Sequence, residues 1–435
     1  MSDWKTEKLS DLVDSKRGIS YGVVQPGYPI PDGIPILRVN NIKNGQILIN
    51  DVLRISSEIE SKHSRTRLVG GEVLMTIVGT VGDTAIATER EAGWNVARAV
   101  AVIPPQPGVS SKWIQLCLQS PTVREAIFNR VTTTVQTTLN LRDISELKIP
   151  MPSEKERNAI TAVLGALDDK IELNRRMNTT LEAMARALFK SWFVDFDPVR
   201  AKMEGKQPFG MDAATAALFP SRLVPSPLGD IPEGWNIGTI RDFCKRVESG
   251  GTPSRNQTAY WDKGTIPWLT SGEVRQKIVL DTKEKITQSG LDGSNAKIWP
   301  SLTTVVAMYG ATAGQVTLLG KQMSANQACC ALIPKDSTAS FVFLKTSQSV
   351  SEYEGQATGS AQQNLNQSIV ANLPSVVPQS KVLEIFETMI SPYIRSMIQN
   401  TNEIEYIEKI RDYLLPKLIS GDIRIPDAEK FLEAA

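Results

Sequence analysis

Apolar residues recur at steps of three and four along residues 153–193, a stretch with one glycine and no proline. Its repeating positions are Ile160, Leu164, Leu167, Ile171, Asn174, Asn178, Leu181, Ala185, Leu188 and Trp192. Because eight of these ten positions are apolar, the pattern predicts one long helix with a coiled-coil-like seam. Ser153 followed by Glu156 is typical of a helix N-terminus. Such a helix would span roughly 60 Å, so we expect it to need a partner.

The same pattern recurs 226 residues further along the chain and predicts a second long helix over residues 379–421. The corresponding positions are Phe386, Ile390, Tyr393, Met397, Asn400, Ile404, Ile407, Arg411, Leu414 and Leu418. Pro392 should kink this helix or weaken one turn. We predict that the two helices pair antiparallel, with Asn174 and Asn400 meeting across the seam. A buried asparagine pair fixes register at a cost in stability.

The segments before the two helices are also repeated. Ile34–Leu37 recurs as Ile266–Leu269, residues 73–82 recur as 305–314, and residues 101–104 recur as 331–334. A repeat of this length indicates a duplicated domain, which we predict to be of the α+β class. The predicted segments are a first domain over 1–152, a helix over 153–193, a connector over 194–231, a second domain over 232–378, a helix over 379–421 and a tail over 422–435.

Composition excludes few classes of function. The 435 residues include 48 basic and 47 acidic side chains, so no global field indicates nucleic acid or a membrane. The four cysteines lack metal-ligand spacing, and we expect buried thiols in a reducing compartment. The polar start of the chain is unlike a signal peptide, and no apolar run is long enough to cross a bilayer. We therefore expect a cytoplasmic protein.

The end of the first helix and the connector carry the most specific motifs. They read LFKSWFVDFDPVR over 188–200, GMD over 210–212, AALFP over 216–220 and GDIPEGW over 229–235. With the duplication, this layout resembles the DNA-specificity subunit of type I restriction-modification enzymes. The resemblance implies two target-recognition domains that each read half of a bipartite double-stranded DNA target, with the long helices setting the spacer.

The resemblance also implies partners and a chain without chemistry of its own. Two modification subunits would bind S-adenosylmethionine and methylate adenine at N6, and two restriction subunits would use ATP and Mg to translocate and cleave DNA. His63 is the only histidine, and residues 314–322 miss the spacing of a phosphate loop. A methyltransferase or nuclease with diverged motifs, or a bridging scaffold that binds no DNA, remains the alternative.

Polar and basic residues beside the β-rich runs are the candidates for DNA contact, because Arg and Lys bind phosphates or guanine and Asn and Gln can pair with adenine. In the first copy they are Lys16, Arg17, Tyr21, Arg38, Asn40, Asn41, Lys62, Arg65, Arg67 and Gln136. In the second copy they are Thr252, Ser254, Arg255, Asn256, Tyr260, Trp261, Arg275, Tyr309, Gln315, Gln362 and Gln363. The predicted seam residues are Asn174, Asn400, Ile171, Met397, Leu181 and Ile407.

Aromatic residues at the end of the first helix allow two interpretations. Phe189, Trp192, Phe193 and Phe196 could form a core where the helix meets the connector, or a docking surface for a modification subunit. We favour core packing, with a docking surface nearby.

Overall fold

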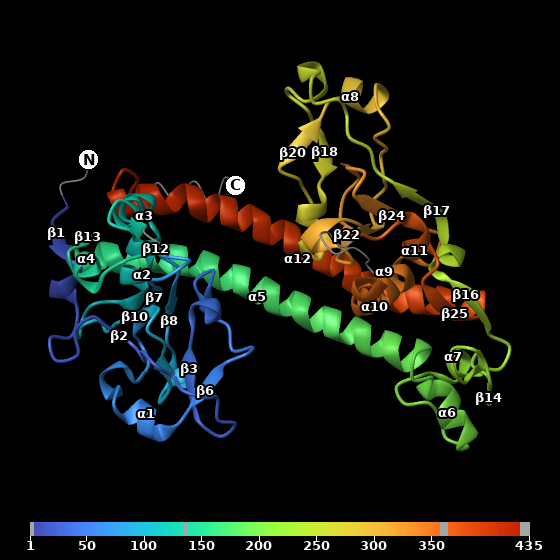
Figure 1. Cartoon of the computed structure of the whole chain (residues 1–435), viewed down its shortest axis with the longest axis horizontal. Coiled ribbons are helices and arrows are strands. Elements are labelled where there is room, and N and C mark those ends of the chain that lie inside the picture. Colours follow the sequence, from blue (N-terminus) through green and yellow to red (C-terminus); the bar gives the residue numbers. More distant parts are fainter. Residues whose placement is uncertain (1–3, 134–136, 357–363, 427–435) are drawn as a thin grey trace. The chain divides into compact units, whose positions relative to one another are not determined.

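The computed structural model describes residues 4–133, 137–356 and 364–426. The chain divides into two compact units, one made of Met1–Ile171 with Tyr406–Ala435 and the other of Glu172–Glu405 (Figure 1). We call them the first and second units. Each unit contains one of the duplicated domains and half of each long helix, so the helices are shared between the units.

The first unit is built on two small sheets. The larger has the strand order β2-β10-β7-β8 with antiparallel neighbours, and the smaller has the order β6-β3-β9, in which β3 is antiparallel to β6 and parallel to β9. Their strands are β2 (Ser20–Tyr21), β3 (Ile34–Leu37), β6 (Leu53–Ile55), β7 (Val73–Thr76), β8 (Thr84–Ile86), β9 (Asn95–Val96) and β10 (Val100–Ile103). Every side chain of β7 and β10 is buried, as expected for central strands covered on both faces.

Short elements complete the first unit. They are β1 (Thr6–Lys8), η1 (Leu9–Leu12), η2 (Val39–Asn41), β4 (Ile42–Lys43), β5 (Gln46–Ile47), α1 (Ser57–Ser61), η3 (Ser64–Thr66), η4 (Glu89–Glu91), α2 (Ser111–Gln119), α3 (Pro121–Phe128), β11 (Thr132–Thr133), β12 (Thr137–Thr138), α4 (Leu141–Ser145) and β13 (Lys148–Pro150). Helix α2 buries Trp113 and Leu116 in the main core of this unit, and the indole Nε1 of Trp113 donates to Pro150 O at 3.0 Å.

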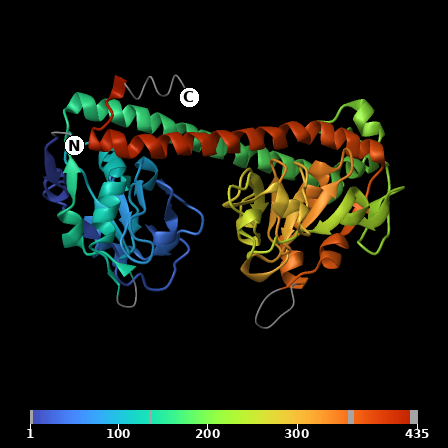
Figure 2. The ribbon, with the colours of Figure 1, turned by 90° about the horizontal axis from the view of Figure 1, so that it is seen from above.

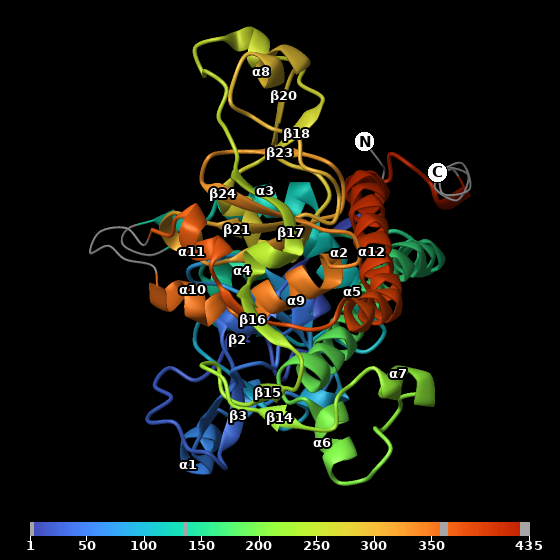
Figure 3. The same ribbon diagram turned by 90° about the vertical axis from the view of Figure 1, so that its right-hand side faces the viewer.

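The second unit repeats this plan with one additional strand. Its larger sheet has the order β17-β24-β21-β22-β19 and its smaller sheet the order β20-β18-β23. Figure 3 shows β17, β21 and β24 of the larger sheet and β18, β20 and β23 of the smaller sheet. The strands are β16 (Asn236–Thr239), β17 (Cys244–Ser249), β18 (Ile266–Leu269), β19 (Ile278–Val279), β20 (Glu284–Ile286), β21 (Thr304–Ala307), β22 (Val316–Leu319), β23 (Ser324–Ala325), β24 (Cys329–Pro334) and β25 (Pro374–Val377). The helices are η5 (Ile240–Phe243), η6 (Thr258–Tyr260), η7 (Ser271–Arg275), α8 (Gln288–Asp292), η8 (Gly310–Thr312), α9 (Ala339–Gln348), α10 (Val350–Gln356) and α11 (Gln367–Ala371).

Backbone hydrogen bonds show that the two domains are duplicates, with corrections to two of the predicted alignments. Val100 pairs with Thr76 in the first unit, and Cys329 pairs with Ala307 in the second. Val73 therefore corresponds to Thr304, one residue before the predicted Val305. Ala101 likewise corresponds to Cys330, one residue before the predicted Ala331. The turn that follows β21 is one residue longer than the turn after β7, so Gly82 and Gly314 still coincide.

Both predicted long helices are confirmed. They are α5 (Glu154–Phe193) and α12 (Ser380–Ser420), and Ser153 Oγ accepts from Glu156 N at 3.3 Å at the start of α5. Helix α12 continues through Pro392. In the first unit the beginning of α5 packs against the end of α12 (Figure 2), and in the second unit the end of α5 packs against the beginning of α12. The pairing is antiparallel in each unit, as predicted.

The seam residues are buried as predicted, but the asparagines have other partners. Asn174 is 1% exposed and Asn400 is 8% exposed. Asn174 Nδ2 donates to Glu403 Oε2 at 2.9 Å, and Asn400 Nδ2 donates to Asn178 Oδ1 at 2.9 Å. Asn178 Nδ2 also donates to Thr401 Oγ1 at 3.3 Å. The predicted direct pairing of Asn174 with Asn400 is wrong, because the register brings each asparagine opposite a residue one turn beyond its duplicate.

The remaining seam positions fit the predicted stripe. Ile171, Met397 and Ile407 are buried, and Leu181 packs half-buried against the core of the second unit. In the first unit Asp168 of α5 joins this seam to the domain, because its carboxylate lies 2.6 Å from Lys112 Nζ and 3.1 Å from Arg411 Nη1.

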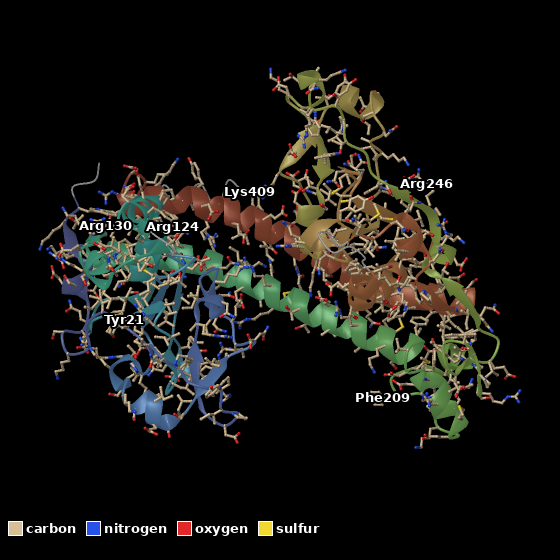
Figure 4. All side chains as sticks on the ribbon, in the orientation of Figure 1. Tyr21, Arg124, Arg130, Phe209, Arg246 and Lys409 are labelled. Atoms are coloured by element: carbon tan, nitrogen blue, oxygen red, sulfur yellow. The ribbon has the colours of Figure 1, made fainter. Side chains whose placement is uncertain are left out.

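The connector folds into short pieces, as its glycines and prolines indicated. They are α6 (Asp197–Met203), α7 (Ala213–Ala217), β14 (Leu223–Val224) and β15 (Ile231–Pro232). Phe189, Trp192, Phe193 and Phe196 are all buried in the core of the second unit, so core packing is confirmed for them. Phe209, in contrast, is fully exposed in the loop between α6 and α7 (Figure 4).

All four cysteines are free and buried. Burial raises the pKa of the Cys244 and Cys330 thiols to about 12. The prediction of buried thiols is therefore confirmed.

Candidate nucleic-acid interface

Several predicted DNA-contact arginines of the first unit are bound to carboxylates of the same unit. Arg17 Nη1 lies 2.6 Å from Glu72 Oε1, and Arg67 Nη2 lies 2.5 Å from Glu60 Oε2. Both glutamates are buried, and the hydrogen bond from Arg67 lowers the pKa of Glu60 below its ordinary value. Breaking a pair would leave a buried charge without a partner, so these arginines hold the fold of this segment.

The neighbouring candidates include both bonded and exposed side chains. Arg65 Nε donates to Arg17 O, and Lys62 Nζ lies 3.2 Å from Glu58 Oε1, whereas Lys16 has an exposed side chain. The Nη2 atom of Arg38 lies 2.8 Å from Asp51 Oδ2. Asn41 is buried, accepts from Arg38 N and donates to Leu48 O. The candidate contact at Asn41 is thus corrected: this side chain shapes the loop, while Asn40 beside it is exposed.

Two open hollows adjoin at the ends of the strands in the first unit. One, of about 350 Å³, is lined by Tyr21, Ile77, Val78, Arg98, Ala99, Thr138, Leu139, Asn140 and Leu141. The other, of about 670 Å³, is lined by Arg38, Val39, Asn40, Ile42, Lys43, Thr80, Asp83, Ala97 and Ala99. Ala99 lines both. We call this region the strand-end surface, and Tyr21 on it is 47% exposed (Figure 4).

The strand-end surface has the chemistry that DNA recognition needs. Arg98 and Lys43 are exposed cations that can bind phosphates or guanine, Asn40 can pair with adenine, and Asp83 can accept from the amino group of cytosine. Arg98 was missed by the sequence reasoning. The sequence feature that could have indicated it is a single charge between the two apolar runs that form β9 and β10.

The corresponding surface of the second unit carries different side chains on the same backbone. Met308 N donates to Ala328 O as Ile77 N donates to Ala99 O. This correspondence makes Tyr309 the counterpart of Val78 and Gln327 the counterpart of Arg98. Tyr309 is 42% exposed and Gln327 is exposed, and Thr252 Oγ1 donates to Gln327 Oε1. Two predicted candidates, Thr252 and Tyr309, therefore belong to this surface.

The other candidates of the second unit form a separate aromatic cluster or lie apart. The guanidinium of Arg255 pairs with Glu284 and stacks 3.7 Å above the ring of Trp261, whose Nε1 donates to Ser254 O at 3.1 Å. Tyr260 lies half-buried beside Gly293. Stacked and paired in this way, Arg255 stabilises its loop.

Six predicted DNA-contact residues remain, of which three lie in the described part of the chain. Arg275 and Asn256 are exposed, and Gln315 Nε2 donates to Glu354 Oε1 at 3.1 Å. Gln136, Gln362 and Gln363 lie outside the described residues.

The described part of the chain lacks two features of other protein classes. Within residues 4–133, 137–356 and 364–426, no three His, Cys, Asp or Glu side chains form a group that could hold a metal ion. None of the helices in these same ranges is long and apolar enough to span a membrane.

Comparison with known proteins identifies the family. The sequence profile described as type I restriction modification DNA specificity domain matches residues 1–183 and 232–417, one match for each copy of the repeat. A solved S subunit of a type I restriction-modification system from M. genitalium has the same fold, with a TM-score of 0.58 at 13% identity over 96% of both chains.

Two of the relatives match over nearly the whole chain, and a third matches over less than half of it. The HindI specificity subunit of Haemophilus influenzae is 25% identical over 97% of this chain and 100% of its own length. The MjaIX specificity subunit of Methanocaldococcus jannaschii is 23% identical over 98% and 94%, and the EcoBI specificity subunit of Escherichia coli is 33% identical over 42% and 41%. The predicted specificity subunit is confirmed: this chain belongs to the family of type I restriction-modification DNA specificity subunits.

Proposed function

We propose that the two domains of this specificity subunit each read one half of a bipartite DNA target, and that the paired helices set the unread spacer. The observation that carries this proposal is the duplicated backbone framework with different exposed side chains. Arg98 and Gln327 occupy equivalent places, as do Val78 and Tyr309. Equal frameworks with unequal side chains suit two readers of different short sequences.

The proposed partners are two modification subunits and two restriction subunits. The modification subunits bind S-adenosylmethionine and methylate adenine at N6, while the restriction subunits use ATP and Mg. Exposed Phe209 and half-exposed Met203 and Val194 lie in the connector, which follows the aromatic core at the end of α5 in the sequence. These exposed apolar side chains support docking of a modification subunit near the connector. The complex works in the cytoplasm, where the DNA lies.

The decisive experiment reads the target of the complex. The chain is co-expressed with its modification subunits in a host without other adenine methylation, and the methylated motif is sequenced. We expect two short specified sequences separated by a fixed unspecified spacer. Exchanging residues 1–152 for those of another such subunit should change one half-site only. A change in both halves, or a continuous motif, would contradict the modular arrangement.

The spacer is tested by a paired insertion of four residues. One copy is placed between Ile171 and Glu172 of α5 and the other between Glu405 and Tyr406 of α12, where the units divide. Four residues add about 6 Å, close to two base pairs at about 3.4 Å each. The spacer should lengthen by about one or two base pairs with both half-sites retained. Insertion in α5 alone is the control, because it breaks the antiparallel register and should destabilise the chain. An unchanged spacer in the paired variant would show that the helices do not set it.

A further inference from the structure

We propose that Arg98 reads a guanine in the half-site bound by the first unit, and that Gln327 reads an adenine in the other half-site. This inference rests on the proposed function, because it assigns base recognition to particular side chains of the two surfaces. Neither residue was among the candidates that the sequence indicated.

The backbone around Arg98 is held rigidly. Its amide N donates to Val23 O at 2.8 Å, and Val23 N donates to Val96 O at 2.8 Å. Ala97 N donates to Leu37 O at 2.8 Å, so strands on both sides fix this turn. A fixed backbone lets a side chain bind a base without the added cost of ordering a loop.

The guanidinium of Arg98 is available, unlike those of its neighbours. Arg17, Arg38 and Arg67 are paired with carboxylates of the first unit. Within the described ranges, the Arg98 side chain has neither an ion pair nor a hydrogen bond, and it is exposed beside the first hollow. The planar fork of a free guanidinium matches the O6 and N7 acceptors of guanine, which is the commonest specific contact in the major groove.

Gln327 occupies the same place in the second unit. Asn326 N donates to Leu269 O at 2.9 Å and Cys329 N donates to Asn326 O at 3.1 Å, as Ala97 and Val100 do in the first unit. The hydroxyl of Thr252 donates to Gln327 Oε1 and so orients the amide. The oxygen keeps one lone pair and the nitrogen two donors, which suffices for bidentate contact with adenine.

The test is selection of a randomised duplex library by the complex of this chain with its modification subunits. Arg98→Ala should remove the preference for guanine at one position of one half-site, reducing discrimination there by about 5- to 150-fold. The second half-site should be unchanged. Arg98→Lys keeps the charge but not the fork, so it should bind DNA nearly as tightly while losing much of the same preference. Gln327→Ala should relax one adenine in the other half-site.

Arg124→Ala is the matched control, because this exposed arginine lies on α3 and lines neither hollow (Figure 4). It should leave the selected motif intact. An Arg98→Ala motif identical to that of the parent, or relaxed at a base other than guanine, would overturn the assignment. Uniform weakening on all sequences would do the same, since it indicates a phosphate contact. If the parent complex selects no bipartite motif, the proposed function fails instead.

Discussion

The polar layer in the helix seam should fix register, and its asparagines can be tested separately. The layer consists of Asn174, Asn178, Asn400, Thr401 and Glu403. Asn400 is the more buried partner of its pair, because it is 8% exposed while Asn178 is half-buried. Asn178→Leu would leave the buried Asn400 amide without its acceptor at 2.9 Å. A buried polar group left unsatisfied costs about 1–3 kcal/mol, so this variant should lower the free energy of unfolding by that amount.

The double variant Asn178→Leu with Asn400→Leu should behave differently. Replacing both partners by apolar side chains of similar size is nearly neutral or stabilising, because no polar group remains unsatisfied. The two substitutions should therefore couple, with the double variant recovering most of the loss caused by Asn178→Leu. The complex that contains this double variant should also methylate targets of more than one spacer length, since the Asn178–Asn400 hydrogen bond no longer fixes the helix register.

Thermal unfolding followed by circular dichroism at the helix band measures the effect. For a unit of this size, about 1 kcal/mol lowers Tm by about 2–4 °C. Asn400→Leu alone should cost less than Asn178→Leu, because water can reach the half-buried Asn178 oxygen. The reasoning would be refuted if Asn178→Leu melted at the parent temperature, or if the double variant were destabilised by the sum of the single effects.

Three other substitutions test individual contacts. Asp168→Asn should destabilise the first unit by about 1 kcal/mol, less at high salt, because its two ion pairs are about a quarter exposed; Tm at two salt concentrations checks this. Glu60 has a lowered pKa through Arg67, so it stabilises the fold above its ordinary pKa of about 4.3, and this contribution is lost as the pH falls through the lowered value. Glu60→Gln should lower Tm at neutral pH and flatten its fall on acidification. Gly165→Ala should stabilise α5 by about 0.5–1 kcal/mol, because an added Cβ there meets nothing within 4 Å; urea unfolding would show a higher midpoint.

The helices could be predicted from sequence because their period of apolar residues is unambiguous over forty positions. The register of the helix pair could not be predicted, because it depends on how whole side chains pack against one another. Asn174 and Asn400 are duplicates in the sequence, yet hydrogen bonding brings Asn174 to Glu403 and Asn400 to Asn178. Sequence equivalence therefore predicts the residue that faces each asparagine only to within one helical turn.

Two other features could not be predicted from the sequence: which strand residues of the two domains are equivalent, and which carboxylate pairs with each arginine. The extra residue in the turn after β21 moves the alignment by one position, which reverses the face that each side chain occupies. Arg17 looked like a DNA contact because its partner Glu72 lies 55 residues away in the sequence. The sequence alone does not show which carboxylate the fold places beside an arginine.

The difference between Arg17 and Arg98 also explains how two half-sites can differ on one framework. Arg17 is paired with a buried glutamate, so its replacement would destabilise the domain. Arg98 and Gln327 project from turns whose stability comes from backbone hydrogen bonds, so the side chain there can change without loss of the fold. Residues without a buried ion-pair partner are therefore the ones through which a duplicated reader can acquire a second target sequence.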